Sequence, residues 1–394
     1  MTSAQKVVAV ALVLTGLSMR TAVTSVGAVL DDVEHGLHTG SGVAGVITTL
    51  PVICFAVIGA TAPRLSGRIG SHLLLVAALV AMTCGLVLRA LSSDVWLFLV
   101  LSVLALTGGA VANVLLPSLV KQHFPERIGP MTAVYTTALA VGTTLAAGLT
   151  VPIGNLAGSH EHWRVSLGSW ALLSAVGILP WLSTLRHDRS TGDPARLPLS
   201  ALRRSRTAWL LMLFFGFQSM QAYVAFGWYE RFLHAHGIPE STAGWMVALF
   251  SALGVPVSAV APSVPARHHR ALVMSLAGIW GLSYLGLGIA PVGGAWVWMV
   301  LGGIGSGLFP VVLAMIGLRS RDTTTTATLS AFVQCIGYVI AGLGPLLFGV
   351  LYGATHAWVL PLALLWVALA VTVGCAWFAA EPRFVDDEMA ASAS

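Results

Sequence analysis

Charged residues are scarce in this sequence. Asp, Glu, Lys and Arg together make up 9% of the 394 residues, while 57% are hydrophobic, whereas about 25% of residues in ordinary soluble domains are charged. Such a chain cannot cover a water-facing surface, which excludes a soluble enzyme and a disordered chain. The net charge of +5 comes from bases too sparse to form a polyanion-binding surface, so we expect no nucleic-acid partner.

Paired cysteines and clustered catalytic residues are also lacking. The four cysteines fall in apolar runs without a short paired spacing, and the adjacent His268 and His269 have no carboxylate beside them. Metal sites and disulfide frameworks show shorter, repeated spacings. Within the apolar runs there is no pair of carboxylates and no His beside a Ser or Cys. The sequence therefore predicts no enzyme activity, no metal site and no cofactor.

Long apolar runs, by contrast, are abundant. Each run is about 20 residues or longer, which is the length that crosses a bilayer as a helix, and none shows the ten-residue alternation of a membrane barrel. We expect helices over residues 7–30, 40–62, 72–91, 95–120, 130–156, 163–185, 207–233, 241–262, 270–290, 293–317, 324–352 and 356–380. The sequence thus predicts an all-α integral membrane protein with twelve transmembrane helices.

The first six helices and the last six share a weak sequence repeat. Seven residues separate Gly109 from Pro117 in the fourth helix, and seven separate Gly302 from Pro310 in the tenth. Parallel six-helix repeats joined by a basic segment are typical of major facilitator carriers, in which the solute binds near the bilayer midplane. We expect two pseudo-symmetric halves: an N-terminal half, a basic cytoplasmic linker, a C-terminal half and a cytoplasmic tail, over residues 1–185, 186–206, 207–380 and 381–394.

The basic residues indicate the orientation. If both termini are cytoplasmic, 16 of the 20 Lys and Arg residues lie inside, and the outside loops hold only Arg89, Arg164 and Arg231. This asymmetry follows the positive-inside rule. The first helix is too long for a signal peptide and lacks a small-residue cleavage site, so we interpret it as a retained span. We expect a multi-pass monomer of the cytoplasmic (inner) membrane.

Arg20 is the charged residue expected deepest in the lipid bilayer. It lies 14 residues from Lys6 and 11 from Asp31, which is about 21 Å and about 17 Å along a helix. One interpretation is an arginine that snorkels or pairs with an acid of a neighbouring helix. However, all 15 acids and all 12 histidines fall in expected loops or near helix ends. A planar, permanently charged side chain at that depth suits an anion or a polar planar solute, so we expect Arg20 to contact the substrate.

The other polar residues of the spans indicate the size of the solute. Exporters of cationic drugs commonly carry a carboxylate or His within the membrane, and none is expected here. The strongly polar side chains of the spans are few and include Asn113, Gln218 and Gln334, which favours a small solute. Each of them has an alternative role as hydrogen-bonding glue between helices.

Seven stretches, spread in order over most of the chain, carry a family pattern. They read LSMRTAVTSVGAVL, TTLPVICF, FPERIGPMTAVYTTAL, WRVSLGSWALL, FFGFQSMQAY, GWYERFLHAHGIPESTAGWM and LSAFVQCIGYVIAGLGPLLFG. Together they resemble the cyanate and 2-nitroimidazole transporter family of the major facilitator superfamily, and the first is similar to its Leu-Arg-x-Ala-x-Thr-Ser-Val-Gly signature. The loop PRLSGRIGSH departs from the superfamily pattern, because Gly67 stands where an Asp belongs and Ser71 and His72 replace a basic pair.

The resemblance implies an alternating-access secondary carrier for a small anion such as cyanate or a compact planar solute such as 2-nitroimidazole. In this superfamily helices 1, 4, 7 and 10 line the cavity. The residues expected to bind the substrate are Arg20, Asn113, Tyr135, Gln218, Tyr223, Gln334 and Tyr338, with Trp228 and Phe309 as gate or stacking residues. For Trp228, anchoring at the membrane interface is an equally good interpretation.

Two rival functions remain open. A proton-coupled multidrug-type exporter of larger neutral compounds would bind many bulky solutes without needing Arg20. A sensor or membrane-embedded enzyme would need soluble domains or a polar catalytic cluster, and the longest expected stretch outside the membrane has only 21 residues. The direction of transport and its coupling are not indicated by the sequence.

Overall fold

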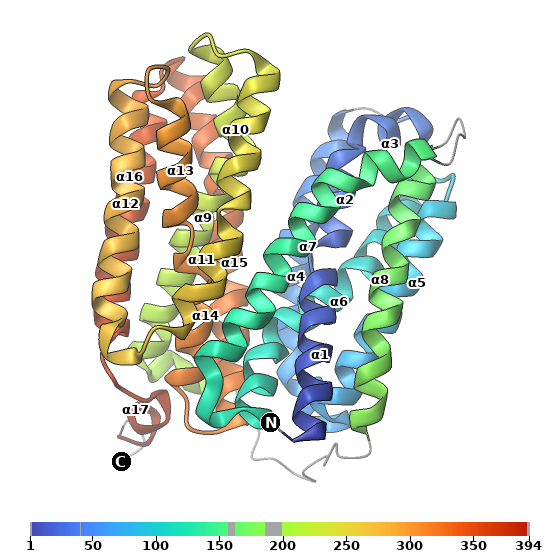
Figure 1. Ribbon diagram of the computed structural model, residues 1–394, viewed down its shortest axis with the longest axis vertical. Helices are drawn as coiled ribbons and strands as arrows, with labels where there is room; N and C mark the ends of the chain where they lie inside the picture. Colours follow the sequence, from blue (N-terminus) through green and yellow to red (C-terminus); the bar gives the residue numbers. More distant parts are fainter. Residues whose placement is uncertain (1, 40, 157–161, 186–198, 392–394) are drawn as a thin grey trace. The chain divides into compact units, whose positions relative to one another are not determined.

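The computed structural model describes residues 2–39, 41–156, 162–185 and 199–391, and within them the regular elements are all helices (Figure 1). Twelve helical stretches of these residues are long and apolar enough to cross a membrane. The expected all-α integral membrane fold with twelve transmembrane helices is therefore confirmed. The expected linker over 186–206 lies outside the described residues up to residue 198.

The chain divides into two compact units. The N-terminal unit comprises Met1–Glu126 and Val134–Leu197, and the C-terminal unit comprises Arg127–Ala133 and Pro198–Ser394. Each unit carries six of the candidate spans, apart from the start of the fifth span, which groups with the C-terminal unit.

The N-terminal part of the chain contains eight α-helices and one short 3-10 helix among the described residues. They are α1 (Ser3–Ser18), α2 (Thr21–Ala28), α3 (Leu30–Gly36), α4 (Ser41–Ile69), α5 (Ser71–Leu91), α6 (Val95–His123), η1 (Pro125–Arg127), α7 (Ile128–Leu156) and α8 (His162–Thr184). α5 packs against both α6 and α8.

The C-terminal unit adds nine α-helices and three 3-10 helices in its described part. They are η3 (Leu199–Arg204), α9 (Arg206–Ala235), α10 (Glu240–Ala252), α11 (Gly254–Val260), η4 (Ala261–Ser263), η5 (Ala266–His268), α12 (His269–Ile289), α13 (Ala295–Gly305), α14 (Leu308–Leu318), α15 (Thr323–Thr355), α16 (Val359–Ala379) and α17 (Val385–Ala391). α9 packs against both α15 and α16.

Several helices begin at a side chain that caps them. Asp94, Ser205 and Asp322 precede α6, α9 and α15, and each accepts a hydrogen bond from the backbone N–H three residues further on. Such caps satisfy N–H groups that have no partner inside the helix, so each polar residue fixes where the apolar run after it becomes helical. The ends of these spans are thus encoded locally.

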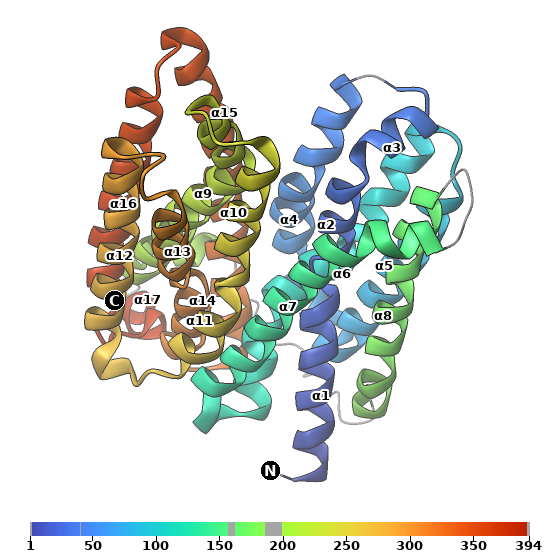
Figure 2. The same cartoon turned by 45° about the horizontal axis from the view of Figure 1, so that its top comes forward.

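Three of the expected spans are interrupted. The first is divided into α1 and α2 at Arg20, the eighth into α10 and α11 at Leu253, and the tenth into α13 and α14 at Ser306 and Gly307. Figures 1 and 2 show α1, α2 and α3 following one another along a single path. A continuous apolar run predicts a span, but it carries no signal for a break of one or two residues.

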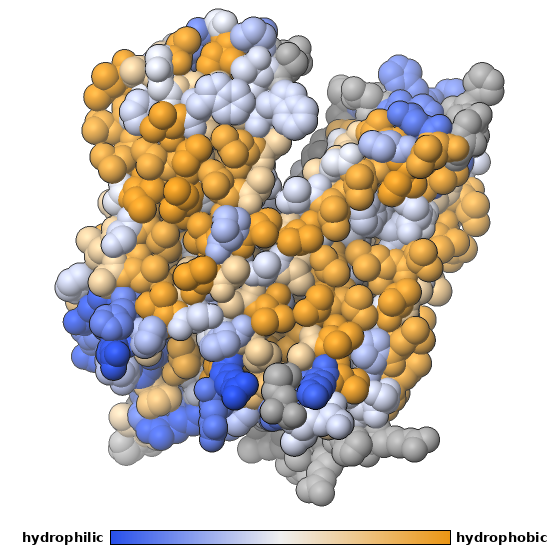
Figure 3. Space-filling model, in the orientation of Figure 1, coloured by the Kyte–Doolittle hydropathy of each residue, from blue (hydrophilic) through white to orange (hydrophobic). Residues whose placement is uncertain are grey.

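The outward faces of the spans are apolar. Leu172 on α8 is 72% exposed, and Trp96 and Trp245 are similarly exposed. Within each unit, Figure 3 shows hydrophobic side chains over the middle of the helices, and hydrophilic side chains over the lower end of α12 in the C-terminal unit. Exposed apolar side chains at this depth are stable because lipid, not water, surrounds them.

Candidate functional site

The first span is interrupted where Arg20 lies. α1 ends at Ser18, α2 begins at Thr21, and the Arg20 backbone between them has φ −108° and ψ −5°. The Ser18 hydroxyl donates to the Thr15 carbonyl at 2.9 Å, and the Thr21 hydroxyl donates to the Ser18 carbonyl at 2.9 Å. Irregular backbone at membrane depth is tolerated where protein buries it or where it lines a cavity, and carriers use such breaks at solute sites.

The Arg20 side chain contacts an aromatic ring. It is half-buried, and its Cζ lies 5.2 Å from the centroid of the Phe55 ring on α4. The face of a ring attracts a guanidinium without using its N–H donors. Phe55 is 1% exposed, so it is a fixed support for the cation. Sequence reasoning did not single out Phe55, because one aromatic residue in an apolar run has no distinguishing pattern.

Two further predicted residues lie on helices that pass close to this break. A Cβ atom on Gly109 of α6 would lie 2.5 Å from the Met19 carbonyl oxygen, so only glycine allows this approach. Asn113 is four residues further on the same face of α6 and is 4% exposed. The Tyr135 carbonyl on α7 packs against Gly16, one turn before the break, and the Tyr135 side chain is 2% exposed.

Arg89 corrects one expectation. The charge count grouped it with the outside loops, although the helix expected over 72–91 includes it; it lies in the last turn of α5 and is 1% exposed. Its Nη1 donates to the Ala22 carbonyl at 3.0 Å and its Nη2 donates to the Ser25 hydroxyl at 3.3 Å, both on α2. Its Nε has no hydrogen-bond partner among the described residues. A carbonyl and a hydroxyl replace water around this cation, and Arg89 thereby braces the helix that begins directly after Arg20.

In the C-terminal unit, Phe215 on α9 brings several predicted residues together. Its ring meets the Tyr338 ring edge-on, with centroids 5.1 Å apart, and lies 5.9 Å from the Phe309 ring. Gly337, beside Tyr338, packs directly against the Phe215 ring, where a Cβ would lie only 2.5 Å from a ring carbon. Phe309 lies just after the break between α13 and α14, so three helices meet at this aromatic cluster.

Two buried glutamines lie near this cluster. The buried Gln218 donates from Nε2 to the Phe215 carbonyl at 3.2 Å and to the Ser219 hydroxyl at 2.6 Å, but its Oε1 accepts no hydrogen bond from the described residues. The equally buried Gln334, one turn before Tyr338, donates to the Ser330 hydroxyl at 2.7 Å. A buried acceptor without a donor is costly, which marks Gln218 as a candidate ligand.

Gln221 shows the alternative role that was open for such residues. Its Nε2 donates to the Thr372 hydroxyl at 3.0 Å, and its Oε1 accepts from the Tyr284 hydroxyl at 2.8 Å. It therefore joins α9 to α16 and α12 as interhelical glue.

Trp228 contacts residues outside the Phe215 cluster. Trp228 is ten residues beyond Gln218, or about 15 Å along the helix, and its indole donates to the Pro345 carbonyl at 3.0 Å. Its ring packs against Phe348 on α15. Tyr223 is half-buried. These contacts suit an anchor between α9 and α15, and a gating role for Trp228 stays a prediction.

Comparison with known proteins decides the family. Residues 9–299 match the family model of the Major Facilitator Superfamily. The chain belongs to the major facilitator superfamily. Within it, the chain is of the cyanate and 2-nitroimidazole transporter type, as its sequence stretches indicated.

Three relatives align with this major facilitator protein over most of their length. It is 33% identical to the uncharacterized transporter YycB of Bacillus subtilis (strain 168), over 95% of this chain and 93% of that one. It is 30% identical to the 2-nitroimidazole transporter of Escherichia coli (strain K12), over 91% and 92%. It is 28% identical to the cyanate transport protein CynX of the same organism, over 86% and 88%.

Solved structures show the same fold. The proton:xylose symporter XylE superposes with a TM-score of 0.78 at 12% identity, over 99% of both chains. The Escherichia coli fucose:proton symporter FucP superposes with a TM-score of 0.73 at 14% identity, over 95% of this chain and 99% of that one. At these identities the likeness establishes the major facilitator fold of the chain and nothing about its solute.

Proposed function

We propose that this major facilitator transporter is an alternating-access secondary carrier for a small anion such as cyanate, or for a compact polar planar solute such as 2-nitroimidazole, with Arg20 as its main ligand. The observation that carries the proposal is the place of Arg20 at the interruption between α1 and α2. The cation stands there against the Phe55 ring, in a span that faces the solute in this superfamily.

The chemistry of a guanidinium suits both solutes. Its planar fork of N–H donors matches the two oxygens of a nitro group or the charged end of a linear anion, and its faces attract aromatic rings. Two relatives are a 2-nitroimidazole transporter and a cyanate transport protein. Solutes of this size need few further contacts.

The remaining predicted residues would complete the site as supporting donors and acceptors. In the N-terminal unit these are Asn113 and Tyr135, on helices that pass beside the break. In the C-terminal unit they are Gln218, Gln334 and Tyr338, and the Gln218 carbonyl oxygen would accept a hydrogen bond from the imidazole N–H of a nitroimidazole. We also propose that both termini are cytoplasmic, from the bias of the basic residues.

The test is direct binding of cyanate and 2-nitroimidazole to the purified protein. Binding is measured by the thermal shift of unfolding and by isothermal titration calorimetry. A ligand that binds only the folded state raises the unfolding temperature. Arg20→Ala should weaken binding by more than about 30-fold, because two charge-assisted hydrogen bonds are lost. Arg20→Lys keeps the charge but loses the fork, so a large loss there would indicate bidentate or stacking recognition.

Arg64→Ala is the matched control. Arg64 lies on α4 of the same unit and is exposed, so its loss should leave both affinities unchanged. Full binding by Arg20→Ala would contradict the proposal. Binding of many bulky neutral compounds that survives the loss of Arg20 would favour the multidrug-type exporter instead.

A further inference from the structure

A groove runs along the apolar outer face of the C-terminal unit between α12 and α16. Its volume is about 320 Å³, and its walls include Met274, Gly278, Gly281 and Leu285 of α12 and Trp366 and Val373 of α16. All of its lining residues are apolar. Met274 is 40% exposed and Leu285 is 48% exposed. Both helices are candidate spans, so this hollow opens toward lipid.

Two glycines create the hollow. A Cβ on Gly278 would meet nothing within 4 Å, whereas a Cβ on Gly281 would lie 3.3 Å from Leu369 and 3.4 Å from Trp366. Gly281 therefore lets the two helices pack closely, and Gly278 leaves space that no protein atom fills. In a membrane, such space is filled by an acyl chain.

The groove has the length of one leaflet. Met274 and Leu285 are eleven residues apart on α12, which corresponds to about 16 Å. One leaflet of hydrocarbon is about 15 Å thick, half of the roughly 30 Å bilayer core. The groove lies around the middle of α12 (His269–Ile289), so an acyl chain in it would run along the central part of this span.

An arginine and a tryptophan stand at the end of the groove where α12 begins. Arg270 is one turn before Met274, and Trp377 is one turn after Val373, so both continue the lining faces of their helices. The Arg270 Cζ lies 5.0 Å from the Trp377 ring centroid, and its Nε donates to the Trp377 carbonyl at 3.3 Å. The side chain of Arg270 is 41% exposed, which suits contact with a headgroup.

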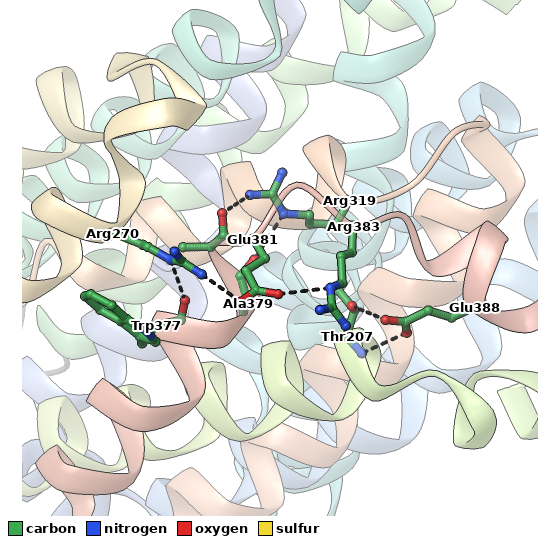
Figure 4. A network of polar contacts seen from close by, with 9 residues as sticks. Thr207, Arg270, Arg319, Trp377, Ala379, Glu381, Arg383 and Glu388 are labelled. Atoms are coloured by element: carbon green, nitrogen blue, oxygen red, sulfur yellow. Dashed lines mark hydrogen bonds and ion pairs between the residues drawn. The ribbon is translucent and has the colours of Figure 1, made fainter.

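The charges around Arg270 are predominantly positive (Figure 4). Glu381 accepts from Arg270 at 2.7 Å and from Arg383 at 2.9 Å. Arg319 donates to the Ala380 carbonyl, directly before Glu381, at 2.8 Å. Glu388 also feels the charge of Arg383, so two carboxylates stand near three guanidinium groups. Basic clusters at the ends of transmembrane helices attract anionic headgroups.

We propose that this groove binds an anionic phospholipid, with one acyl chain between α12 and α16 and the lipid phosphate at Arg270. The groove supplies apolar contact along the central part of α12, and the excess of positive charge at its end selects for a negative headgroup. The inference is independent of the transported solute, because it rests on the outer face of one unit.

Native mass spectrometry of the purified full-length protein tests the proposal, with phosphatidylglycerol and phosphatidylcholine of identical chains added in turn. The first phosphatidylglycerol should bind roughly fivefold more tightly than the first phosphatidylcholine, since one basic side chain near a phosphate is worth that much. Arg270→Gln should reduce this preference to near parity. Gly278→Leu should weaken the first site for both lipids by at least about tenfold, because it displaces at least two methylene groups.

Gly288→Leu is the matched control. Gly288 lies on the same helix with nothing within 4 Å of its would-be Cβ, but it does not line the groove. This variant should retain the first lipid as the wild-type chain does, and thermal unfolding without added lipid should show both leucine variants folded. Equal retention by Gly278→Leu and Gly288→Leu would overturn the proposal. Displacement of the lipid by glycerol phosphate would also overturn it, because the site would then be for a free phosphate.

Discussion

Arg89 in the N-terminal unit and Arg319 in the C-terminal unit are both nearly buried, 1% and 4% exposed, and both donate to backbone carbonyls of a neighbouring helix. The acceptors differ. Arg89 reaches the Ala22 carbonyl inside α2, where the helix already supplies an N–H donor. Arg319 reaches the carbonyls of Ala379 and Ala380 at 3.0 and 2.8 Å, at the end of α16, where the last carbonyls have no donor within the helix.

The two arginines therefore have different roles, one in stability and one in function. Without Arg319, two helix-end carbonyls would lose their hydrogen-bond donor, so its burial stabilises the fold. Removing Arg89 would orphan no carbonyl, and its own charge is buried beside a carbonyl and a hydroxyl at a desolvation cost. A buried charge that the fold could do without is best explained by function, and Arg89 holds the helix that follows Arg20.

The larger of the effects expected for these two arginines is the loss of solute affinity in Arg89→Met. This change keeps the side-chain volume but releases α2, so we expect affinity for the Arg20 ligand to fall by about tenfold or more, while the unfolding temperature does not fall. Arg89→Lys, which can reach only one acceptor, should recover part of the affinity. Titration calorimetry and thermal unfolding on the same samples measure both. A fall in stability at unchanged affinity would make Arg89 purely structural.

Arg319→Met should show the opposite pattern. Two helix-end carbonyls lose their donor, so the free energy of unfolding should drop by about 1–3 kcal/mol, while solute affinity stays that of the wild-type chain. Chemical unfolding in detergent, monitored by tryptophan fluorescence, measures the first, and the same binding titration measures the second. Loss of affinity in this variant would remove the contrast between the two arginines.

The sequence predicted what depends on composition and local pattern. Apolar runs predicted the spans, and capping residues such as Asp94 and Asp322 stand where helices begin. The break at Arg20 was not predicted, because it depends on the close approach of α6 at Gly109 and on side chains that bond the local backbone. The burial of Arg89 was not predicted, because its acceptors lie 64 and 67 residues away in the chain and no local pattern indicates them.

A smaller effect is expected at Glu388, which fastens α17 to the start of α9. Its carboxylate accepts from the Ser205 hydroxyl at 2.6 Å, and from the Thr207 amide and hydroxyl at 3.0 and 2.7 Å. Burial alone would raise the pKa of Glu388, but these hydrogen bonds and the charge of Arg383 lower it below its ordinary value of 4.5. Glu388→Gln should cost about 1 kcal/mol near pH 7, reduced by partial exposure to solvent.

The pH dependence of this contribution follows from the direction of the shift. Because the pKa is lower in the folded chain, the stabilisation is complete above the ordinary pKa and is lost as the pH falls through the lowered one. The difference in unfolding temperature between the wild-type chain and Glu388→Gln should hold from pH 7 to pH 5 and shrink below about pH 4. Glu126→Gln, at an exposed carboxylate, is the control, and a difference that grows toward acid pH would contradict the assignment.

The smallest effect is expected at Arg321, two residues from Arg319. Arg321 and Asp387 form a bidentate pair at 3.0 and 2.8 Å, which raises the pKa of Arg321 and lowers that of Asp387. Their side chains are 57% and 58% exposed, so water and salt screen the attraction, and ordering two long side chains offsets it. Arg321→Ala should therefore leave the unfolding temperature unchanged at physiological salt, with a small decrease only at low ionic strength. Thermal unfolding of this variant and of Arg319→Met across a salt series measures the contrast. A loss at Arg321 as large and as salt-independent as that at Arg319 would show that burial is not what separates these two arginines.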